Sequence, residues 1–429
     1  MNFVKFSIEW EGFQSQTCKN VKLLRMFVPY LTIQRQKEDM KYNFDELIER
    51  RGTNAIKYDA MKELWGREDL IPMWVADMDF RTPPFILEVI RRRLDHEVLG
   101  YTHPADSYYE AIIRWVDKRY GMKVERDDLH YIPGIVPGIH HAVCALTEKG
   151  DKIAIQPPVY HPFRQIIEGT GRVPVCAPLV LRDGRFCMDF DALRRALEDC
   201  KLFILCNPHN PGGVVWTQEE LEEVSRICEA CGVTVISDEI HADMVFAPHR
   251  HRPFATVTPW AREHTVTFMA PSKVFNMPGI IVSQAIVYNP ELRECFYGYI
   301  DQNDLAMGNV FSYLVAEAAY TEGEEWLTQM LDYAQANIRL VDERLKERMP
   351  KIKAVLPEAS FLIFLDCREL GFDTQAELES FFVNEARLGL NNGSMFGEEG
   401  TGFMRLNVAA PRSVVEQALQ QLEDAYARL

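Results

Sequence analysis

The chain has 429 residues, of which 47% are hydrophobic and 26% charged, a balance that excludes a protein disordered along its whole length. Its formal net charge of −16 argues against binding to nucleic acid or to anionic membrane surfaces, because a negative field repels phosphate groups. No run approaches the roughly 18 apolar residues that a transmembrane helix requires, and the ten cysteines are scattered singly, as in reduced proteins. We therefore expect a cytoplasmic protein with no nucleic-acid or membrane partner.

The N-terminal segment, residues 1–41, differs from the rest of the chain because it shows no clear hydrophobic period. A short apolar stretch lies within Val21–Ile33, but it lacks the longer apolar core and the small-residue cleavage site of a signal peptide. We interpret the segment as an N-terminal extension, either disordered or produced by a misplaced start. The folded protein is then expected to begin near Tyr42.

Four short apolar runs in the middle of the chain predict buried β-strands. Their nearly continuous apolar character fits a parallel sheet covered on both faces by helices. Between the second and third runs we expect a helix that begins after Thr217, which forms a capping box with Glu220, and ends at Gly232. This alternation indicates an α/β fold with a mostly parallel sheet. The four runs are Lys152–Gln156, Leu202–Cys206, Val233–Ser237 and Thr265–Met269.

A long helical pattern from about Glu325 leads into strands and helices with a different rhythm. This change marks the expected boundary between two domains. We expect a large domain over residues 85–324 and a smaller α/β domain formed by residues 42–84 together with 325–429. A ligand site would then lie between the two domains.

One lysine, Lys273, follows the predicted strand Thr265–Met269. Burial of a lysine at the end of a strand lowers the pKa of its amine, which prepares the amine for attack on a carbonyl carbon. From position alone, a surface lysine at the start of a loop is the alternative interpretation.

Two carboxylates, Asp238 and Glu239, directly follow the third run, at the end of a parallel strand where α/β proteins bind ligands. A buried carboxylate there requires a cationic partner. A metal ion is one candidate, with His241 and Asp243 nearby, but the spacing matches no common metal motif. We therefore expect no metal site, and the other candidate is the protonated nitrogen of a heterocycle.

Three further segments lie at predicted strand ends. Asn207–Gly213 contains two asparagines and two prolines, a denser pattern than a simple turn requires. Pro133–Ile139 precedes a helical pattern whose start would present free N–H groups to a phosphate. Tyr160 places an aromatic ring after the first run. A phosphorylated aldehyde with a pyridinium ring would use the lysine, the aspartate and all three of these features.

These residues, in this order, resemble the fold-type I pyridoxal 5′-phosphate (PLP) enzymes and, within them, the MalY/PatB group of cystathionine β-lyases. The resemblance covers the chain from about residue 42 to the C-terminus. It implies an α/β fold in which helices sandwich the mostly parallel sheet of a large domain, with a smaller α/β domain beside it. It also implies PLP as the cofactor. The matching segments are Trp74–Phe80, Gly100–Tyr101, Pro157–Tyr160, Asn207–Gly213, Asp238–Asp243, Ser272–Asn276 and Phe403–Asn407.

The resemblance implies roles for the residues nearest to the chemistry. Lys273 resembles the lysine that forms a Schiff base with PLP, and Asp238 resembles the partner of the pyridine nitrogen. Arg405 resembles the arginine that binds the α-carboxylate of the substrate, for which its planar fork is well suited. Asn210 is similar to the residue that hydrogen-bonds the phenolic oxygen of PLP, and Tyr160 to the ring stacked on the pyridine.

A second set of residues resembles the phosphate site of the family. Ile135 and Val136 match the phosphate-binding backbone at a helix start, and Ser272 adds a hydroxyl group. Tyr101 resembles a tyrosine that reaches the phosphate from a second subunit, which implies a homodimer with a shared active site.

Two positions depart from the aspartate-aminotransferase-like relatives. His241, which we count among the cofactor-binding residues, stands where they carry a tyrosine, and Ile281 stands where they carry a phosphate-binding arginine. Both departures agree with the β-lyase group, although a further phosphate donor is then needed.

The activity implied is PLP-dependent β-elimination from cystathionine or related cysteine S-conjugates, which yields pyruvate, ammonia and a thiol. The alternative is a PLP-dependent aminotransferase of a small amino acid, because no residue in the sequence separates the two reactions. A regulatory protein that keeps the cofactor site but acts by binding a partner is a third interpretation, against which the intact Lys273, Asp238 and Arg405 argue.

Overall fold

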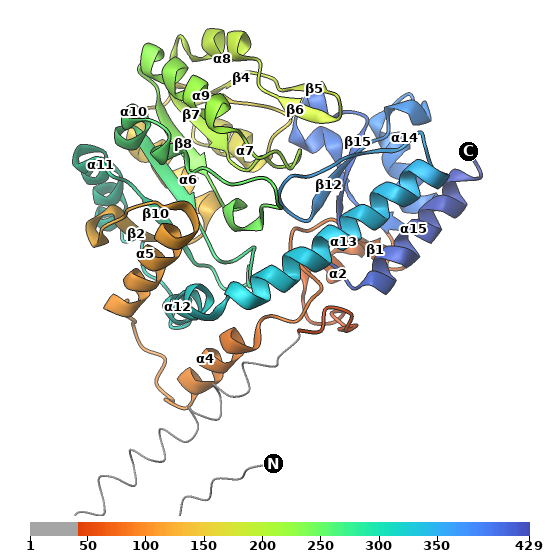
Figure 1. Ribbon diagram of the computed structural model, residues 1–429, viewed down its shortest axis with the longest axis horizontal. Helices are drawn as coiled ribbons and strands as arrows, with labels where there is room; N and C mark the ends of the chain where they lie inside the picture. Colours follow the sequence, from red (N-terminus) through yellow and green to blue (C-terminus); the bar gives the residue numbers. More distant parts are fainter. Residues whose placement is uncertain (1–41) are drawn as a thin grey trace, which may run out of the picture. The chain divides into compact units, whose positions relative to one another are not determined.

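A seven-stranded mixed sheet, in the left half of Figure 1, is the largest sheet among residues 42–429, which the computed structural model describes. The expectations for residues 1–41 lie outside this range. Five neighbouring strands run parallel, in the order β9–β8–β7–β3–β4, and β10 lies antiparallel between β9 and β2. The strands are β2 (Leu129–Ile132), β3 (Lys152–Ile155), β4 (Val173–Cys176), β7 (Cys200–Cys206), β8 (Thr234–Asp238), β9 (Thr265–Met269) and β10 (Ser283–Ile286).

Helices cover both faces of this sheet, as predicted from its apolar strands. Leu202 and Ile204 of β7 belong to one buried cluster, whereas Phe203 and Leu205, which alternate with them, belong to another. The first cluster contains residues of α6 (Ile135–Leu146), α7 (Pro162–Gly169) and α11 (Pro290–Gln302). The second contains residues of α8 (Phe190–Leu197), α9 (Gln218–Cys231) and α10 (Pro259–Glu263).

The predicted helix after Thr217 is confirmed in detail. In α9 the Thr217 side chain accepts a hydrogen bond from the Glu220 N–H, and the Glu220 side chain accepts one from the Thr217 N–H. Gly232 ends the helix with φ of 66°, a left-handed conformation that favours glycine. The four predicted strands are also confirmed, with differences of one or two residues at their ends.

A second sheet of four strands, in the order β11–β12–β15–β14, is antiparallel throughout. The long helix α13 (Glu324–Arg348) packs against α15 (Arg412–Tyr426) and against β11 (Figure 1). A short parallel pair, β1 with β13, joins the N-terminal part of the described chain to its C-terminal part. The strands are β1 (Ile71–Pro72), β11 (Lys353–Val355), β12 (Leu362–Asp366), β13 (Leu388–Gly389), β14 (Asn391–Asn392) and β15 (Phe403–Asn407).

The two sheets come from the chain segments expected for the large and the small domain. Phe44–Leu429 nevertheless forms one compact unit, so the division into two domains stays a prediction. Among residues 42–429, none of the helices has the length and the apolar character needed to cross a bilayer. The remaining elements are α2 (Ile56–Asp59), α3 (Met61–Trp65), α4 (Pro84–Leu94), α5 (Asp106–Tyr120), α12 (Ser312–Glu322), α14 (Gln375–Ser380), β5 (Val180–Arg182) and β6 (Arg185–Cys187).

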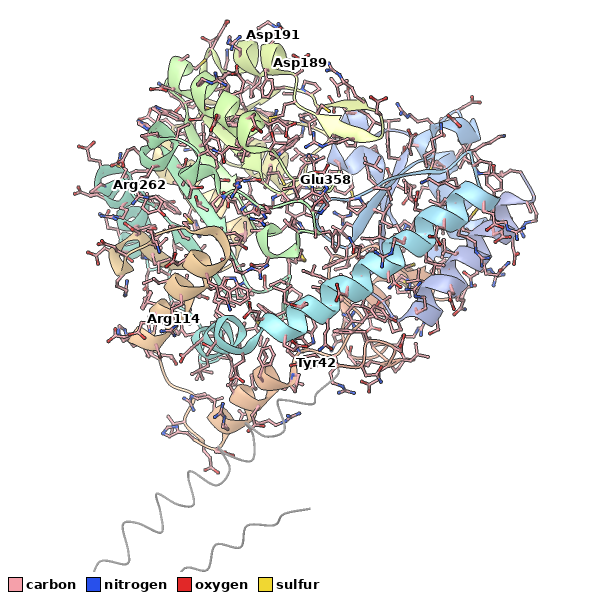
Figure 2. All side chains as sticks on the ribbon, in the orientation of Figure 1. Tyr42, Arg114, Asp189, Asp191, Arg262 and Glu358 are labelled. Atoms are coloured by element: carbon pink, nitrogen blue, oxygen red, sulfur yellow. The ribbon has the colours of Figure 1, made fainter. Side chains whose placement is uncertain are left out.

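The turn after β7 is fixed against the segment that precedes β12. Glu358, labelled in Figure 2, accepts a hydrogen bond from the Val215 N–H at 2.7 Å and pairs with Arg185 at 2.9 Å. Gly213 has φ of 68°, and a Cβ atom there would lie 2.5 Å from Cβ of Pro357, so only glycine fits. This packing holds the end of β7, from which Asn210 extends.

Candidate active site

Three of the predicted residues follow neighbouring parallel strands at the same edge of the large sheet. Asp238 is the last residue of β8, Asn210 lies in the turn after β7, and Lys273 lies in the loop after β9. Arg405 comes from β15 of the other sheet, and its Nη1 atom donates a hydrogen bond to Oδ1 of Asn210 at 3.0 Å. The structure therefore brings residues from both sheets together at one place.

Asp238 is a buried carboxylate, with 4% of its surface exposed, and burial raises its pKa to about 7. Its Oδ1 atom accepts a hydrogen bond from the Ile240 N–H at 3.1 Å, which opposes the rise. Among the described residues, no cation lies within ion-pair distance of it. Its neighbour Glu239, by contrast, accepts hydrogen bonds from Ser237, His251 and the Phe254 N–H. Asp238 is thus the carboxylate that still needs a partner.

Lys273 is partly buried, and its Nζ atom donates a hydrogen bond to the carbonyl oxygen of Ala76 at 3.0 Å. Burial lowers the pKa of Lys273 to about 8, and the positive charge of Arg405 lowers it further, while Asp77 and Asp238 act in the opposite direction. An amine with this pKa is available in its neutral, nucleophilic form near physiological pH.

Arg405 is buried and makes hydrogen bonds only to neutral oxygen atoms. Its Nη2 atom donates to Oδ1 of Asn391 at 2.6 Å and to the carbonyl oxygen of Trp74 at 3.2 Å. Its guanidinium group also lies 4.9 Å from the ring centre of Phe396. Burial lowers its pKa to about 10. In the described part of the chain no carboxylate pairs with it, so this buried cation is suited to binding a carboxylate from outside.

Two histidines lie beside these charges. His241 is buried, and its Nδ1 atom has no hydrogen-bond partner among the described residues. Burial and the charges of Lys273 and Arg405 lower the pKa of His241 to about 3. Burial and the charge of Arg405 likewise lower the pKa of His161 to about 4. Both rings are therefore neutral at pH 7, where they offer hydrogen bonds without adding positive charge.

The start of α6 packs into the same apolar cluster as the strand ends. Ile135 is buried there, and Val136, Tyr160 and Ile240 pack against the cluster. The helix begins directly after Gly134, whose φ of 97° favours glycine, and its first N–H groups have no partners within the helix. Burial and the nearby Asp238 raise the pKa of Tyr160. The structure thus places the helix start and the tyrosine ring next to the end of β8.

Two predicted residues are not joined to this group by any contact. Tyr101 is 96% exposed and follows a segment with the exposed apolar residues Val98 and Leu99. Ser272 precedes Lys273, but in the described part of the chain its hydroxyl group makes no hydrogen bond. The predicted roles of Tyr101 and Ser272 at a phosphate stay predictions, as do the roles expected of the other site residues.

Asp243, the last residue of the Asp238–Asp243 segment, has its partners within the protein. Residues 42–429 contain no group of three or more His, Cys, Asp or Glu side chains that could hold a metal ion. Asp243 instead accepts hydrogen bonds from Nε1 of Trp115 and pairs with Arg119 at 2.7 Å.

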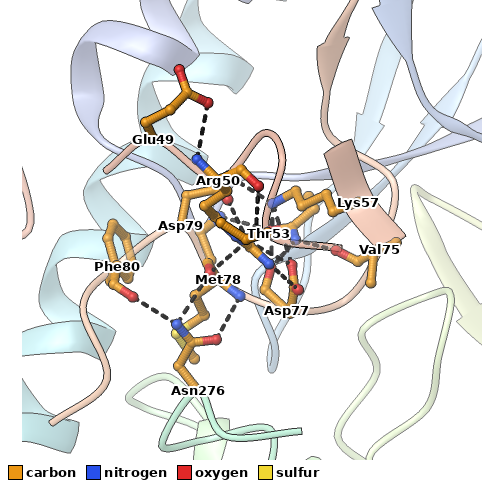
Figure 3. A network of polar contacts seen from close by, with 12 residues as sticks. Glu49, Arg50, Thr53, Lys57, Val75, Asp77, Met78, Asp79, Phe80 and Asn276 are labelled. Carbon is orange, nitrogen blue, oxygen red and sulfur yellow. Dashed lines mark hydrogen bonds and ion pairs between the residues drawn. The ribbon is translucent and has the colours of Figure 1, made fainter. Parts of the chain in front are cut away.

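Sequence reasoning matched the Trp74–Phe80 segment to the family but missed its contacts. Nδ2 of Asn276 donates to the carbonyl oxygens of Met78 and Phe80, at 3.1 and 2.7 Å (Figure 3). Nδ2 of Asn407 donates to those of Val75 and Asp77, at 2.6 and 2.7 Å. Both asparagines lie within three residues of Lys273 or Arg405. The only signal in the sequence was their presence in the motifs Ser272–Asn276 and Phe403–Asn407.

Comparisons with known proteins identify the family of the chain. Residues 68–422 match the family described as aminotransferase class I and II. Cystathionine beta-lyase PatB of Bacillus subtilis is 40% identical over 385 residues, which cover 89% of this chain and 99% of that protein. Protein MalY of Escherichia coli is 32% identical and covers 90% of this chain and 98% of that protein. The crystal structure of cystalysin from Treponema denticola, which contains PLP, aligns with a TM-score of 0.88 and 32% identity, covering 91% of this chain and 100% of that one.

The chain belongs to the class I and II aminotransferase family and, within it, to the MalY/PatB group. The expected α/β fold of the fold-type I class is thereby confirmed, with one antiparallel strand, β10, inside its central sheet.

Proposed function

We propose that the protein is a PLP-dependent carbon–sulfur β-lyase that cleaves cystathionine or a related cysteine S-conjugate to pyruvate, ammonia and a thiol. The observation that carries the proposal is that two groups occur at one site. They are Arg405, a buried cation with only neutral partners, and the strand-end amine of Lys273, on which the charge of Arg405 acts. A carboxylate and a reactive carbonyl are the groups that these two side chains suit. Relatives named as cystathionine β-lyases support the reaction type.

The donor set fits PLP. Asp238, buried without a cationic partner, would bind the protonated pyridine nitrogen, and Lys273 would bind the aldehyde carbon as a Schiff base. Tyr160 would stack on the ring, while Asn210 and the unpartnered nitrogen of His241 would face its polar substituents. When bound, PLP supplies an electron sink for the electron pair left on Cα of the substrate.

The phosphate group would bind at the start of α6. We assign it to the N–H groups of Ile135 and Val136 and to the hydroxyl group of Ser272. Tyr101 would reach it from a second subunit, so the active unit would be a homodimer. The exposure of Tyr101 beside exposed apolar residues supports an interface at this segment. A cytoplasmic location is supported by the described cysteines, which are all free.

Two residues of the chain then have separate roles in the proposed reaction. Arg405 binds the α-carboxylate with two parallel hydrogen bonds and fixes the orientation of Cα. Lys273 takes the Cα proton on Nζ as general base, which its lowered pKa permits near neutral pH. The β-sulfur leaves with the electron pair of the C–S bond.

The deciding experiment supplies cystathionine to the purified protein without any keto acid. A β-lyase produces pyruvate continuously, whereas an aminotransferase of a small amino acid stops after one turnover. Arg405→Ala should raise KM and lower the rate in either case, because both reactions need the oriented carboxylate. Consumption of cystathionine that depends strictly on added 2-oxoglutarate, and that yields glutamate but neither pyruvate nor a thiol, would refute the lyase proposal and favour the aminotransferase.

A further inference from the structure

Four buried or half-buried charges form a cluster, and two of them, Asp77 and Asp79, lie on the Trp74–Phe80 segment (Figure 3). Arg50 pairs with Asp77 and with Asp79, both at 2.6 Å. Lys57, whose side chain is 1% exposed, pairs with Asp79 at 2.7 Å and lies 3.7 Å from Asp77. Two carboxylates are therefore held by two cations within one network.

The two carboxylates differ in their relation to Lys273. Asp77 directly follows Ala76, whose carbonyl oxygen accepts the hydrogen bond from Nζ of Lys273 at 3.0 Å. The charge of Asp77 acts on that amine, whereas the charge of Asp79 acts on Arg50 and Tyr58. Within the network, Asp77 is thus the carboxylate next to the residue that contacts the amine, and Asp79 lies two residues further along the chain.

Four ionisable groups face Lys273 from the elements around it. Arg405 of β15 contributes a positive charge, and His241 contributes a neutral ring. Asp238 of β8 and Asp77 contribute the negative charges. Since Asp238 is the residue suited to the cofactor nitrogen, Asp77 is the carboxylate that remains to balance a charge on the amine.

We propose that Asp77, together with the carbonyl group of Ala76, is the counter-charge for the protonated form of Lys273. The inference rests on the proposed function, in which Lys273 is the general base. As the C–H bond of the substrate breaks, the proton moves to the lone pair of Nζ and the electron pair stays on Cα. The ammonium group that forms donates to the Ala76 carbonyl and is stabilised by the Asp77 carboxylate.

Arg50 and Lys57 explain why Asp77 does not act as the base itself. Hydrogen bonds from Arg50 and an ion pair with Lys57 at 3.7 Å hold the carboxylate in one position. Asp77 therefore acts through Lys273 and is a positioning residue, because its own oxygen atoms are bonded to the network. The hydrogen bonds from Asn276 and Asn407 fix the backbone that carries it.

The test measures how fast the Lys273 amine of the full-length, cofactor-free protein reacts with acetic anhydride as a function of pH, read by peptide mass spectrometry. Only the neutral amine reacts, so the midpoint of the profile reports the pKa of Lys273. Asp77→Asn should move the midpoint to lower pH by about 1 unit, the lower end of the range for a neighbouring charge. Asp79→Asn removes the same charge from the same network and should leave the midpoint nearly unchanged.

Arg50→Gln should shift the midpoint in the opposite direction. It releases Asp77 from one of its two cations, so the midpoint should move to higher pH, and Arg50 is exposed enough for the chain to tolerate the change. Equal shifts in the two aspartate variants, or no shift in Asp77→Asn and Arg50→Gln, would overturn the proposal. If Asp77→Asn does not fold, the direction of the Arg50→Gln shift alone decides it.

The reactivity profile does not depend on which reaction the protein catalyses, so failure of the lyase assay and failure of this inference are separate results. In the holoenzyme, a counter-charge role for Asp77 predicts that its loss changes kcat but not KM. Asp77→Asn should lower kcat about tenfold, the change expected from a loss of about one pKa unit of base strength and ammonium stabilisation, with KM nearly unchanged. An increase in KM alone would contradict a role through Lys273.

Discussion

Two groups of buried charged residues meet where Nζ of Lys273 donates to the carbonyl oxygen of Ala76, the residue before Asp77, and the two groups have opposite kinds of partner. In the network that includes Asp77 and Asp79 of the Trp74–Phe80 segment, every charge has a partner of opposite sign within the chain. At the strand ends, the charges have neutral partners or backbone partners instead. The first group is Arg50, Lys57, Asp77 and Asp79, and the second is Asp238, Lys273 and Arg405.

This difference in partners distinguishes charges that stabilise the fold from charges that are available for binding and catalysis. A buried ion pair satisfies its own charges and fixes the chain in one arrangement. A buried charge without a partner costs free energy and shifts its pKa until a ligand supplies the missing charge. We therefore expect substitutions in the second group to affect turnover most, and substitutions in the first group to affect the free energy of unfolding most.

The largest expected effect is that of Lys273→Ala. Loss of both the covalent link to PLP and the general base should lower pyruvate formation by at least about 10³-fold. The visible absorption band of the lysine-linked cofactor should also disappear, whether or not cofactor stays bound without a covalent link. Lys201→Ala, at an exposed position of β7, is the matched control and should change neither quantity. An unchanged spectrum in Lys273→Ala would remove this residue from its role.

Asp238→Ala comes next. In the role proposed for Asp238, the substitution would leave the pyridine nitrogen without its anionic partner, so we expect kcat to fall by about 10²–10⁴-fold with a smaller change in KM. The neighbouring Glu239→Gln should behave in the opposite way, with kcat nearly preserved and the free energy of unfolding reduced, because Glu239 has three partners inside the protein. Steady-state kinetics and urea unfolding of both variants test this contrast. A loss of only a few-fold in Asp238→Ala would place the anionic partner elsewhere.

The pH dependence of stability gives a third test, in the cofactor-free protein. The pKa of Asp238 is about 7 in the folded chain against an ordinary value of 3.8, so the unfolded chain binds fewer protons between these values. The contribution of Asp238 to stability must then fall as pH rises from about 4 to 7, by up to about 4 kcal/mol at about 1.36 kcal/mol per pKa unit. Histidines with lowered pKa values, such as His209 and His241, have the opposite effect, because their contribution to stability rises with pH over much of the same range.

The measurement for this third test is the difference in the free energy of unfolding between the natural protein and Asp238→Asn across that pH range. The histidine contributions are common to both proteins and cancel in the difference. A difference that stays flat between pH 4 and 7 would show that the Asp238 carboxyl group keeps its ordinary pKa.

Lys57→Met should have the smallest of the four effects. It removes one of the two cations that hold Asp79, at a position with 1% exposure, and should lower the free energy of unfolding by about 2–3 kcal/mol. Lys62→Met removes an exposed pair with Glu68 and should cost less than about 1 kcal/mol. Denaturant titration measures both. Similar values for the two variants would mean that burial of the network adds nothing to its strength.

Sequence patterns predicted the elements whose signals are local. The helix after Thr217 was predicted with its caps, and Asp238, Asn210 and Lys273 were placed at one edge because the carboxyl ends of parallel strands meet there. Arg405 was placed only by resemblance to the family, since it lies in a different sheet.

The features that the sequence did not predict depend on contacts between distant residues, which leave no periodic pattern in the sequence. Arg50 and Lys57 meet their partners 20 or more residues away across irregular chain, and the Ala76 and Trp74 contacts use backbone oxygens that any residue would supply. The reversed direction of β10 was also not predicted, because the segment between β9 and β10 contains no helix to signal how the chain crosses the sheet.

The neutral surroundings of Arg405 have a practical consequence for the choice of buffer. Asn210, Asn391 and the Trp74 carbonyl leave the guanidinium charge uncompensated, so any small carboxylate that enters the site gains a charge-assisted hydrogen bond. We therefore expect acetate and citrate to compete with the amino-acid substrate, so that a KM measured in such buffers would include an inhibition term. Rates measured over a series of acetate concentrations at constant ionic strength would separate the two.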